Sequence, residues 1–163
     1  RGRTQRKDPR KKRILSIGVI MDYFDYRYRV LYADTDQMGI TYYANYFKWF
    51  EAARTEYFRA LGFPYTECEK KGIYLPVAEA HANYVAPSTY DDDIIVRTSV
   101  AEIGNSTLRF EYQVMKAKTQ IMVATGYTVH VFVNKAMKPC RVPEEIKRVV
   151  KEHTLLKKRC RCK

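Results

Sequence analysis

The sequence has no long apolar run and few cysteines. Its most apolar N-terminal stretch, residues 14–21, is interrupted by Ser16 and Gly18 and is far shorter than the ~20 residues of a membrane-spanning helix. Four scattered cysteines in 163 residues do not resemble the dense pattern of a small secreted domain stapled by disulfides. We therefore expect no membrane span and a reducing compartment, the cytoplasm.

The sequence also lacks the common short signatures of catalytic and nucleotide-binding sites. It has no Gly-x-Ser-x-Gly elbow, no Gly-x-Gly-x-x-Gly turn and no P-loop. Its three histidines, His81, His130 and His153, are not at metal-ligand spacing. His81 and His130 lie in strand patterns, where a hydrogen-bonded structural histidine is the commoner role. We expect neither a metal nor a cofactor.

The formal net charge of +12 comes from the two ends of the chain. Residues 1–13 hold eight Lys or Arg and one acid (+7), and residues 151–163 hold six and one (+5), which leaves residues 14–150 with 16 of each sign. Basic ends often bind nucleic acid or anionic lipid. Neither end interleaves aromatic residues with its charges as single-strand binders do, so we expect solvated tails and no nucleic-acid partner.

The length suits one domain with tails. We expect residues 1–20 to be a basic N-terminal extension that is disordered or not native. We expect residues 21–150 to form the domain and residues 151–163 to be a basic C-terminal tail.

The hydropathy pattern of the middle predicts a strand, a long helix and then four more strands. Residues 24–32 alternate in polarity, which is typical of a half-buried strand. Residues 41–61 carry a wide apolar face at helical spacing, and Gly62 and Pro64 end that helix. The later strands are predicted at residues 74–85, 94–103, 108–114 and 123–133, with a short helix after Pro143. A meander of hairpins gives an antiparallel sheet, and a sheet curled around the long helix predicts an α+β fold.

Two acids, Asp34 and Asp36, lie in a loop just before the long helix. The unpaired N–H groups and positive dipole end of a helix N-terminus favour carboxylates. One interpretation is therefore a helix cap or a turn-forming aspartate. The other is a carboxylate aimed at a carbonyl whose oxygen accepts from the helix N-terminus, which would suit hydrolysis of an activated acyl group. Spacing alone favours the first interpretation.

The segment from Asp34 to Arg54, D-T-D-Q-M-G-I-T-Y-Y-A-N-Y-F-K-W-F-E-A-A-R, closely resembles the hotdog-fold acyl-CoA thioesterases of the 4-hydroxybenzoyl-CoA thioesterase and YbgC type. The likeness continues through residues 75–77, 87–93 and 138–143. It implies a hotdog thioesterase domain over residues 21–150, with an antiparallel sheet curled around a long central helix. It also implies hydrolysis of an acyl-CoA to a free carboxylic acid and coenzyme A.

The resemblance assigns roles to several residues of this segment. Asp36 falls on the catalytic carboxylate, which either attacks the thioester carbonyl or activates water, and the sequence leaves both routes open. The backbone N–H of Tyr43 falls where the thioester oxygen is polarised; some relatives carry histidine there. Asp34 is expected to shape the loop, and Gly39 to give the turn its backbone freedom beside the substrate.

Glu51 falls where the hydroxybenzoyl-specific relative places a carboxylate near the acyl group, which makes it a candidate substrate-binding residue. It is also the common residue there across the wider family, so we expect it to pair with Arg54.

The resemblance also implies partners. Family members are homodimers or homotetramers with each site at a subunit interface. The predicted strand at residues 123–133 supports this, because it would leave a flat apolar edge in a monomer. The thioester could be carried by coenzyme A or by an acyl carrier protein. Candidates for holding the coenzyme A phosphates are Arg97, Arg109, Lys135 and Lys138.

Two other functions stay open. A non-catalytic hotdog-fold binding protein would act through its basic tails on nucleic acid or anionic lipid, in an interaction that weakens with salt. A hotdog dehydratase is disfavoured, because no histidine lies near Asp36 in the sequence to form an acid/base couple. The intact Asp36, Gly39 and helix-start sequence favour the thioesterase.

Overall fold

The computed structural model describes residues 23–150, so the predicted tails at residues 1–20 and 151–163 lie outside the described residues. Its strands are β1 (Phe24–Arg29), β2 (Val77–Tyr84), β3 (Asp93–Ile103), β4 (Thr107–Lys116) and β5 (Met122–Val131). Its helices are the short 3-10 turn η2 (Tyr32–Asp34), α1 (Asn45–Ala60) and α2 (Tyr65–Lys70), and residues 144–150 are also helical. Within residues 23–150, no helix is long and apolar enough to cross a membrane.

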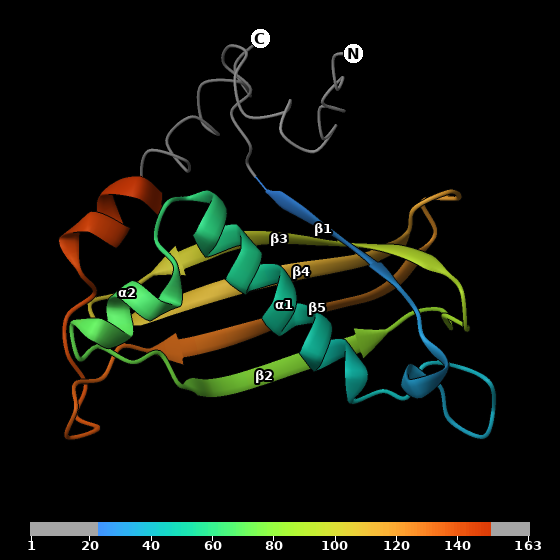
Figure 1. The fold of residues 1–163 in the computed structure, drawn as a ribbon, viewed down its shortest axis with the longest axis horizontal. Helices are drawn as coiled ribbons and strands as arrows, with labels where there is room; N and C mark the ends of the chain where they lie inside the picture. The colour runs from blue at the N-terminus through green and yellow to red at the C-terminus, as the bar shows by residue number, and fades with distance from the viewer. Residues whose placement is uncertain (1–22, 151–163) are drawn as a thin grey trace, which may run out of the picture.

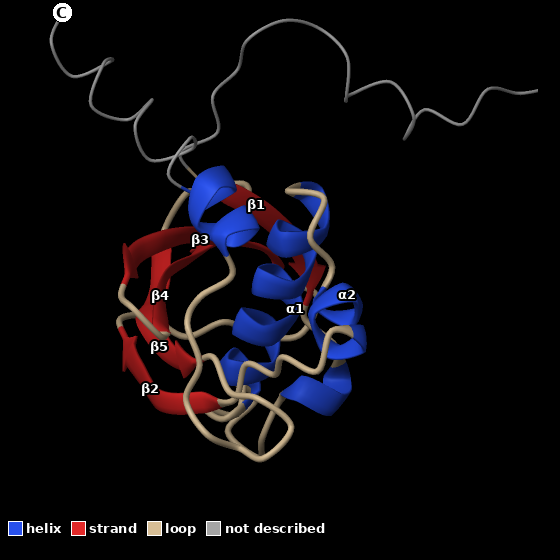
Figure 2. Cartoon of the chain, turned by 90° about the vertical axis from the view of Figure 1, so that its left-hand side faces the viewer, coloured by secondary structure: helices blue, strands red, loops and turns tan. Residues whose placement is uncertain are grey.

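The five strands form one antiparallel sheet in the order β1-β3-β4-β5-β2. The sheet curves around α1, which runs across its concave face (Figures 1 and 2). This confirms the predicted α+β arrangement of an antiparallel sheet around a long helix. The wide apolar face of α1 explains the curvature, because a flat sheet would leave part of that face in water.

The strand pairing corrects one part of the prediction. β3, β4 and β5 follow one another as hairpins, but β2 pairs with β5 rather than with its sequence neighbour β3. The expected apolar edge at residues 123–133 is therefore wrong, because β5 is paired on both sides. The edges of the sheet are β1 and β2. The period-two pattern reports which side chains face the core, and it carries no information on which strand lies next to which.

The core lies between α1 and the sheet. Phe50 of α1 stacks on Tyr112 of β4, with ring centroids 4.2 Å apart. The buried apolar residues of α1 are spaced as predicted from the sequence: Tyr46, Trp49, Phe50, Ala53, Tyr57 and Phe58.

Two boundaries differ from the sequence prediction. The predicted helix at residues 41–61 begins four residues late, because the N–H groups of Asn45 and Phe47 donate three residues back, to Tyr42 and Ala44, and not four residues back as in an α-helix. The backbone N–H groups of Thr41 and Tyr42 donate to Ser88 and Asp34, at 2.8 Å each. The predicted strand at residues 74–85 is shortened to β2, and α2 was not predicted. The backbone bonds donated by Thr41 and Tyr42 hold the loop before α1 in place.

His130 is a buried structural histidine, as expected. Its Nδ1 lies 3.1 Å from the carbonyl oxygen of Leu75, and its Nε2 lies 2.9 Å from the hydroxyl of Thr128. Burial lowers the pKa of His130 to about 4. His81 differs, since it is exposed on β2 and stacks on Tyr127.

Candidate active site

An open groove of about 480 Å³ lies at the N-terminal end of α1. The loop before α1 and the first turn of α1 form one wall of the groove. The end of β2 and the segment that follows it form the other wall. Within residues 23–150, Asp36 is the only charged side chain in the lining. The lining residues are Asp36, Met38, Ile40, Thr41, Tyr43, Tyr46, Tyr84, Val85, Ala86 and Pro87. The groove is therefore largely apolar with a single carboxylate.

Asp36 is held by a tight turn. Its N–H donates to the carbonyl oxygen of Ile40, and its own carbonyl oxygen accepts from the N–H of Gly39, at 2.9 Å each. Gly39 has a φ of +76°, in the left-handed region that favours glycine, as expected for this turn. One carboxylate oxygen of Asp36 accepts from the N–H of Met38 at 2.8 Å. The other has no hydrogen-bond partner in the described part of the chain, so it remains available to a ligand.

Asp34 shapes the loop, as expected. Its buried carboxylate accepts from the hydroxyl of Tyr28 and the N–H of Leu31, at 2.9 Å each. Burial and this carboxylate raise the pKa of Tyr28 to about 12. The carbonyl oxygen of Asp34 accepts from the N–H of Tyr42 at 2.8 Å and from the side-chain amide of Asn45 at 2.9 Å. Asp34 therefore anchors the loop before α1 and does not line the groove.

The start of α1 leaves backbone N–H groups unused. Ala44 is the N-cap residue, and its side chain makes no capping hydrogen bond. The N–H groups of Tyr43 and Ala44 donate to no acceptor among residues 23–150. The carbonyls beside them are held, since the oxygen of Tyr42 accepts from the N–H of Asn45 at 2.9 Å and the oxygen of Tyr43 from the hydroxyl of Tyr84 at 3.0 Å. Such free donors at the positive end of a helix suit a developing negative charge.

Buried hydroxyl groups join the two walls of the groove. The hydroxyl of Ser88 lies 2.7 Å from that of Thr41 and 3.1 Å from that of Tyr46. The N–H of Thr41 also donates to the carbonyl oxygen of Ser88. Burial raises the pKa of Tyr46, so this hydroxyl stays protonated near neutral pH. The loop that carries Asp36 is therefore fixed to the wall that follows β2.

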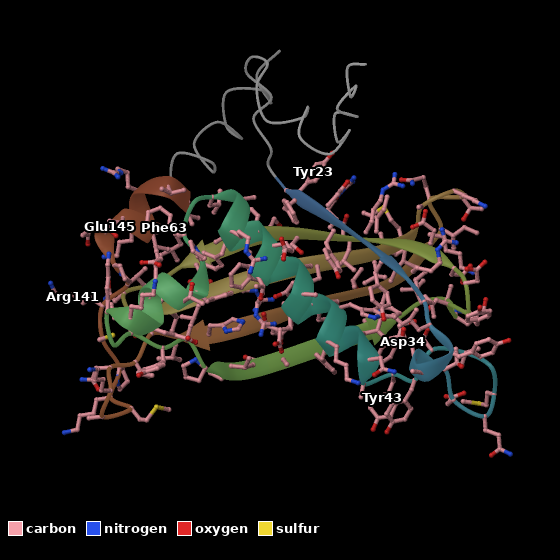
Figure 3. All side chains as sticks on the ribbon, in the orientation of Figure 1. Tyr23, Asp34, Tyr43, Phe63, Arg141 and Glu145 are labelled. Carbon is pink, nitrogen blue, oxygen red and sulfur yellow. The ribbon has the colours of Figure 1, made fainter. Side chains whose placement is uncertain are left out.

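The structure brings Asp36, Gly39 and Tyr43 together at one end of α1 and leaves Glu51 apart. Figure 3 shows Asp34 and Tyr43 at this end of the helix. The Glu51 side chain is 69% exposed, lies outside the lining of the groove and is 3.7 Å from Arg54, the expected pairing.

The four basic candidates for phosphate binding are also outside this groove. Arg97 makes two 2.8 Å bonds to Asp25, and Arg109 lies over the ring of Tyr127. Both line a separate hollow on the outer face of the sheet. Lys135 lies against Gly72, just after α2, and Lys138 follows in the same loop after β5. Within residues 23–150, no cationic side chain lines the groove.

Three residues of the site were missed by sequence reasoning: Asn45, Tyr84 and Ser88. Asn45 stands inside the segment that resembles the thioesterases, but the predicted helix start at residue 41 placed it within the helix, so its bond to the loop was not expected. Tyr84 and Ser88 lie about forty residues away in the sequence. The β2–β5 pairing places Tyr84, and the backbone bond from Thr41 to Ser88 holds the segment after β2 beside the loop before α1.

A model of the thioesterase-like superfamily matches residues 30–150 of this chain. A putative esterase of Aquifex aeolicus is 36% identical over 129 residues, which cover 79% of this chain and 98% of that protein. The acyl-CoA thioesterase YbgC of Haemophilus influenzae is 36% identical over 125 residues, 76% of this chain and 91% of that one. The solved structure of DHNA-CoA thioesterase from Staphylococcus aureus is similar with a TM-score of 0.79 and 29% identity, covering 84% of this chain and 94% of that one. The sheet and central helix are those of the hotdog fold, as predicted.

Proposed function

The chain belongs to the thioesterase-like superfamily, and from this we propose that it hydrolyses the thioester of an acyl-CoA to a free carboxylic acid and coenzyme A. One observation carries the proposal: Asp36 lines the same groove as Tyr43, whose backbone N–H at the start of α1 is unused within residues 23–150. A thioester carbonyl placed there would have a nucleophile or base on one side and hydrogen-bond donors on the other.

In the proposed reaction Asp36 acts in one of two ways. It attacks the thioester carbon and forms a mixed anhydride that water then hydrolyses, or it takes a proton from the water that attacks. Both routes place negative charge on the carbonyl oxygen, and the N–H of Tyr43 is the proposed donor to that oxygen. The carbon–sulfur bond breaks, and the coenzyme A thiolate leaves and takes up a proton.

The lining of the groove favours an uncharged acyl group. Its side chains are aromatic or aliphatic apart from Asp36 and the hydroxyl of Thr41. An acyl group ending in a second carboxylate would be repelled by Asp36 and desolvated without a partner from residues 23–150. We propose that the backbone at Gly39 contacts the substrate. Glu51, which lies outside this groove, would contact the acyl group bound by a second copy.

A second copy would complete the site, so we propose a homodimer or homotetramer. β2 is an edge strand that is exposed along nearly its whole length, and its end, Tyr84, is part of the groove. Such an edge is a template for pairing with another chain. The phosphates of coenzyme A need cations, and no cation of residues 23–150 lines the groove. We propose that a second copy supplies these cations.

The compartment proposed is the cytoplasm. Cys68 and Cys140, the cysteines of the described part of the chain, are both free thiols, which suits a reducing environment.

The direct test is thiol release from a panel of thioesters: short, medium and long aliphatic acyl-CoAs, benzoyl-CoA, 4-hydroxybenzoyl-CoA, succinyl-CoA and a matching acyl carrier protein thioester. We expect release from at least one uncharged acyl-CoA and little from succinyl-CoA. Activity on the carrier-protein thioester alone would replace coenzyme A as the proposed carrier. A folded oligomer that is silent on the whole panel would contradict the function.

A further inference from the structure

We propose that Tyr84 is a positioning residue that holds the backbone of Tyr43, and with it the proposed donor N–H of Tyr43, beside the thioester oxygen. The inference rests on the proposed function, because it concerns how that oxygen is bound. Tyr84 ends β2 and lies about forty residues from Ala44 in the sequence, but its hydroxyl donates to the carbonyl oxygen of Tyr43 at 3.0 Å.

That carbonyl shares a peptide unit with the N–H of Ala44. A trans peptide is planar, and its C=O and N–H point in opposite directions. A bond that fixes the carbonyl of Tyr43 therefore fixes the whole peptide plane that follows this residue, and with it the backbone of Tyr43 at the start of α1.

The helix itself does not hold this peptide. In a continuing α-helix the carbonyl of Tyr43 would accept from the N–H four residues on, that of Phe47. Here the N–H of Phe47 donates to the carbonyl of Ala44 at 3.2 Å. Among residues 23–150, the hydroxyl of Tyr84 is the one hydrogen-bond partner of the Tyr43 carbonyl. Without it, this peptide would be free to rotate and to bond with water.

The ring of Tyr84 is fixed from two sides. It meets the ring of Tyr43 edge-on at 6.5 Å and that of Tyr46 at 5.1 Å, and Tyr46 is held in turn by Ser88. Burial raises the pKa of Tyr84, so its hydroxyl remains a donor throughout the neutral range. Through its hydrogen bond to the Tyr43 carbonyl, Tyr84 therefore holds the start of α1 in a defined position relative to the end of β2. The backbone of Tyr43, which carries the proposed donor N–H, is thereby held in place.

The test compares Tyr84→Phe, which removes only the hydroxyl, with the matched Tyr74→Phe. Tyr74 lies outside the groove, in the segment before β2. With the acyl-CoA that the wild type hydrolyses best, we expect Tyr84→Phe to lower kcat about tenfold with KM changed less than about twofold. This is below the 10²–10³-fold loss on removing an oxyanion donor, because Tyr84 acts through another group. Tyr74→Phe should match the wild type, and melting temperature and oligomeric state should be unchanged in both.

A binding measurement separates positioning from a general loosening of the groove. An acyl-CoA analogue with a trifluoromethyl ketone in place of the thioester presents an oxyanion in its tetrahedral form, and an S-alkyl-CoA thioether has no carbonyl. We expect Tyr84→Phe to weaken the ketone about tenfold and the thioether not at all. Equal weakening of both ligands, or wild-type kcat in Tyr84→Phe, would overturn the inference while leaving the thioesterase intact. A wild type that releases no thiol would instead overturn the proposed function, and this inference with it.

Discussion

The side-chain amide of Asn45 donates to the backbone carbonyl oxygen of Asp34 at 2.9 Å, which ties the first residue of α1 to the far end of the loop before it. Both residues are almost fully buried, at 5% and 8% exposure. The ten residues between them include Asp36 and Tyr43. The spacing of the carboxylate from the free N–H groups is therefore set by a bond that lies outside the groove.

Asn45→Ala should lower both stability and activity. It removes a buried hydrogen bond, which costs about 1–2 kcal/mol of unfolding free energy, and it frees the loop. Asn45→Asp should be worse, because a carboxylate oxygen would then face the carbonyl oxygen of Asp34. Urea unfolding and thiol release on the three proteins measure both effects. Wild-type values for Asn45→Ala would mean that the loop is held without this bond.

Asp36→Asn should abolish thiol release, with at least a hundredfold lower kcat, while the fold is kept. The amide oxygen can still accept from the N–H of Met38, so the turn survives, but an amide neither attacks nor takes a proton. The matched control is Asp91→Asn at an exposed turn with a φ of 66°, a conformation that asparagine tolerates. Mass measurement must exclude deamidation of the variant. Normal turnover by a folded Asp36→Asn protein would refute the carboxylate mechanism.

Substitutions at Tyr43 separate its backbone from its side chain. Tyr43→Pro removes an N–H that has no acceptor within residues 23–150, so it breaks no hydrogen bond there but should lower kcat by two or more orders of magnitude. Tyr43→His keeps the N–H and should retain most activity, because the ring is 58% exposed. Circular dichroism shows whether α1 survives in the proline variant. An inactive, folded Tyr43→His protein would show that the phenol takes part.

Gly126 of β5 marks a close approach between the central helix and the sheet. A Cβ added there would lie 2.5 Å from the carbonyl oxygen of His81 and 2.7 Å from the ring of Phe50. Gly126→Ala should therefore cost about 1–3 kcal/mol by overpacking. Phe50→Leu should relieve the ring contact, so the double variant should lose less stability than the two single losses added together. Strict additivity in a denaturant series would contradict this contact.

The sequence predicted those features of the site whose contacting residues lie close together in the chain. Asp36, Gly39 and Tyr43 fall within one continuous segment, so the turn and the helix start were readable from it. The wide apolar face of α1 likewise predicted a sheet that wraps it. The order of strands was not readable, because alternation along β2 and β5 does not say that they pair. Tyr84 reaches the site at the end of this pairing, and Ser88 reaches it through its bonds to Thr41, a contact that alternation does not predict either.

The pH dependence of stability should depend on His130. Burial lowers its pKa from the ordinary 6.5 to about 4. Between these two pH values the imidazole therefore binds a proton in the unfolded chain but not in the folded protein. Stability from this residue is therefore complete above pH 6.5 and falls as the pH drops toward 4. The shift corresponds to a loss of up to about 3 kcal/mol of unfolding free energy. Urea unfolding at half-unit steps from pH 7 to pH 4 would measure it.

His130→Gln should reduce that slope, because glutamine does not titrate. It should also lower stability at pH 7, since the bonds to Leu75 and Thr128 are disturbed. The matched control is His81→Gln, because His81 is exposed on β2. This variant should leave the slope unchanged. Carboxylates that titrate in the same range are common to all three proteins, so the difference between variants isolates the histidine. An unchanged slope in His130→Gln would mean that this imidazole accepts a proton within the fold, which would require its partners to rearrange.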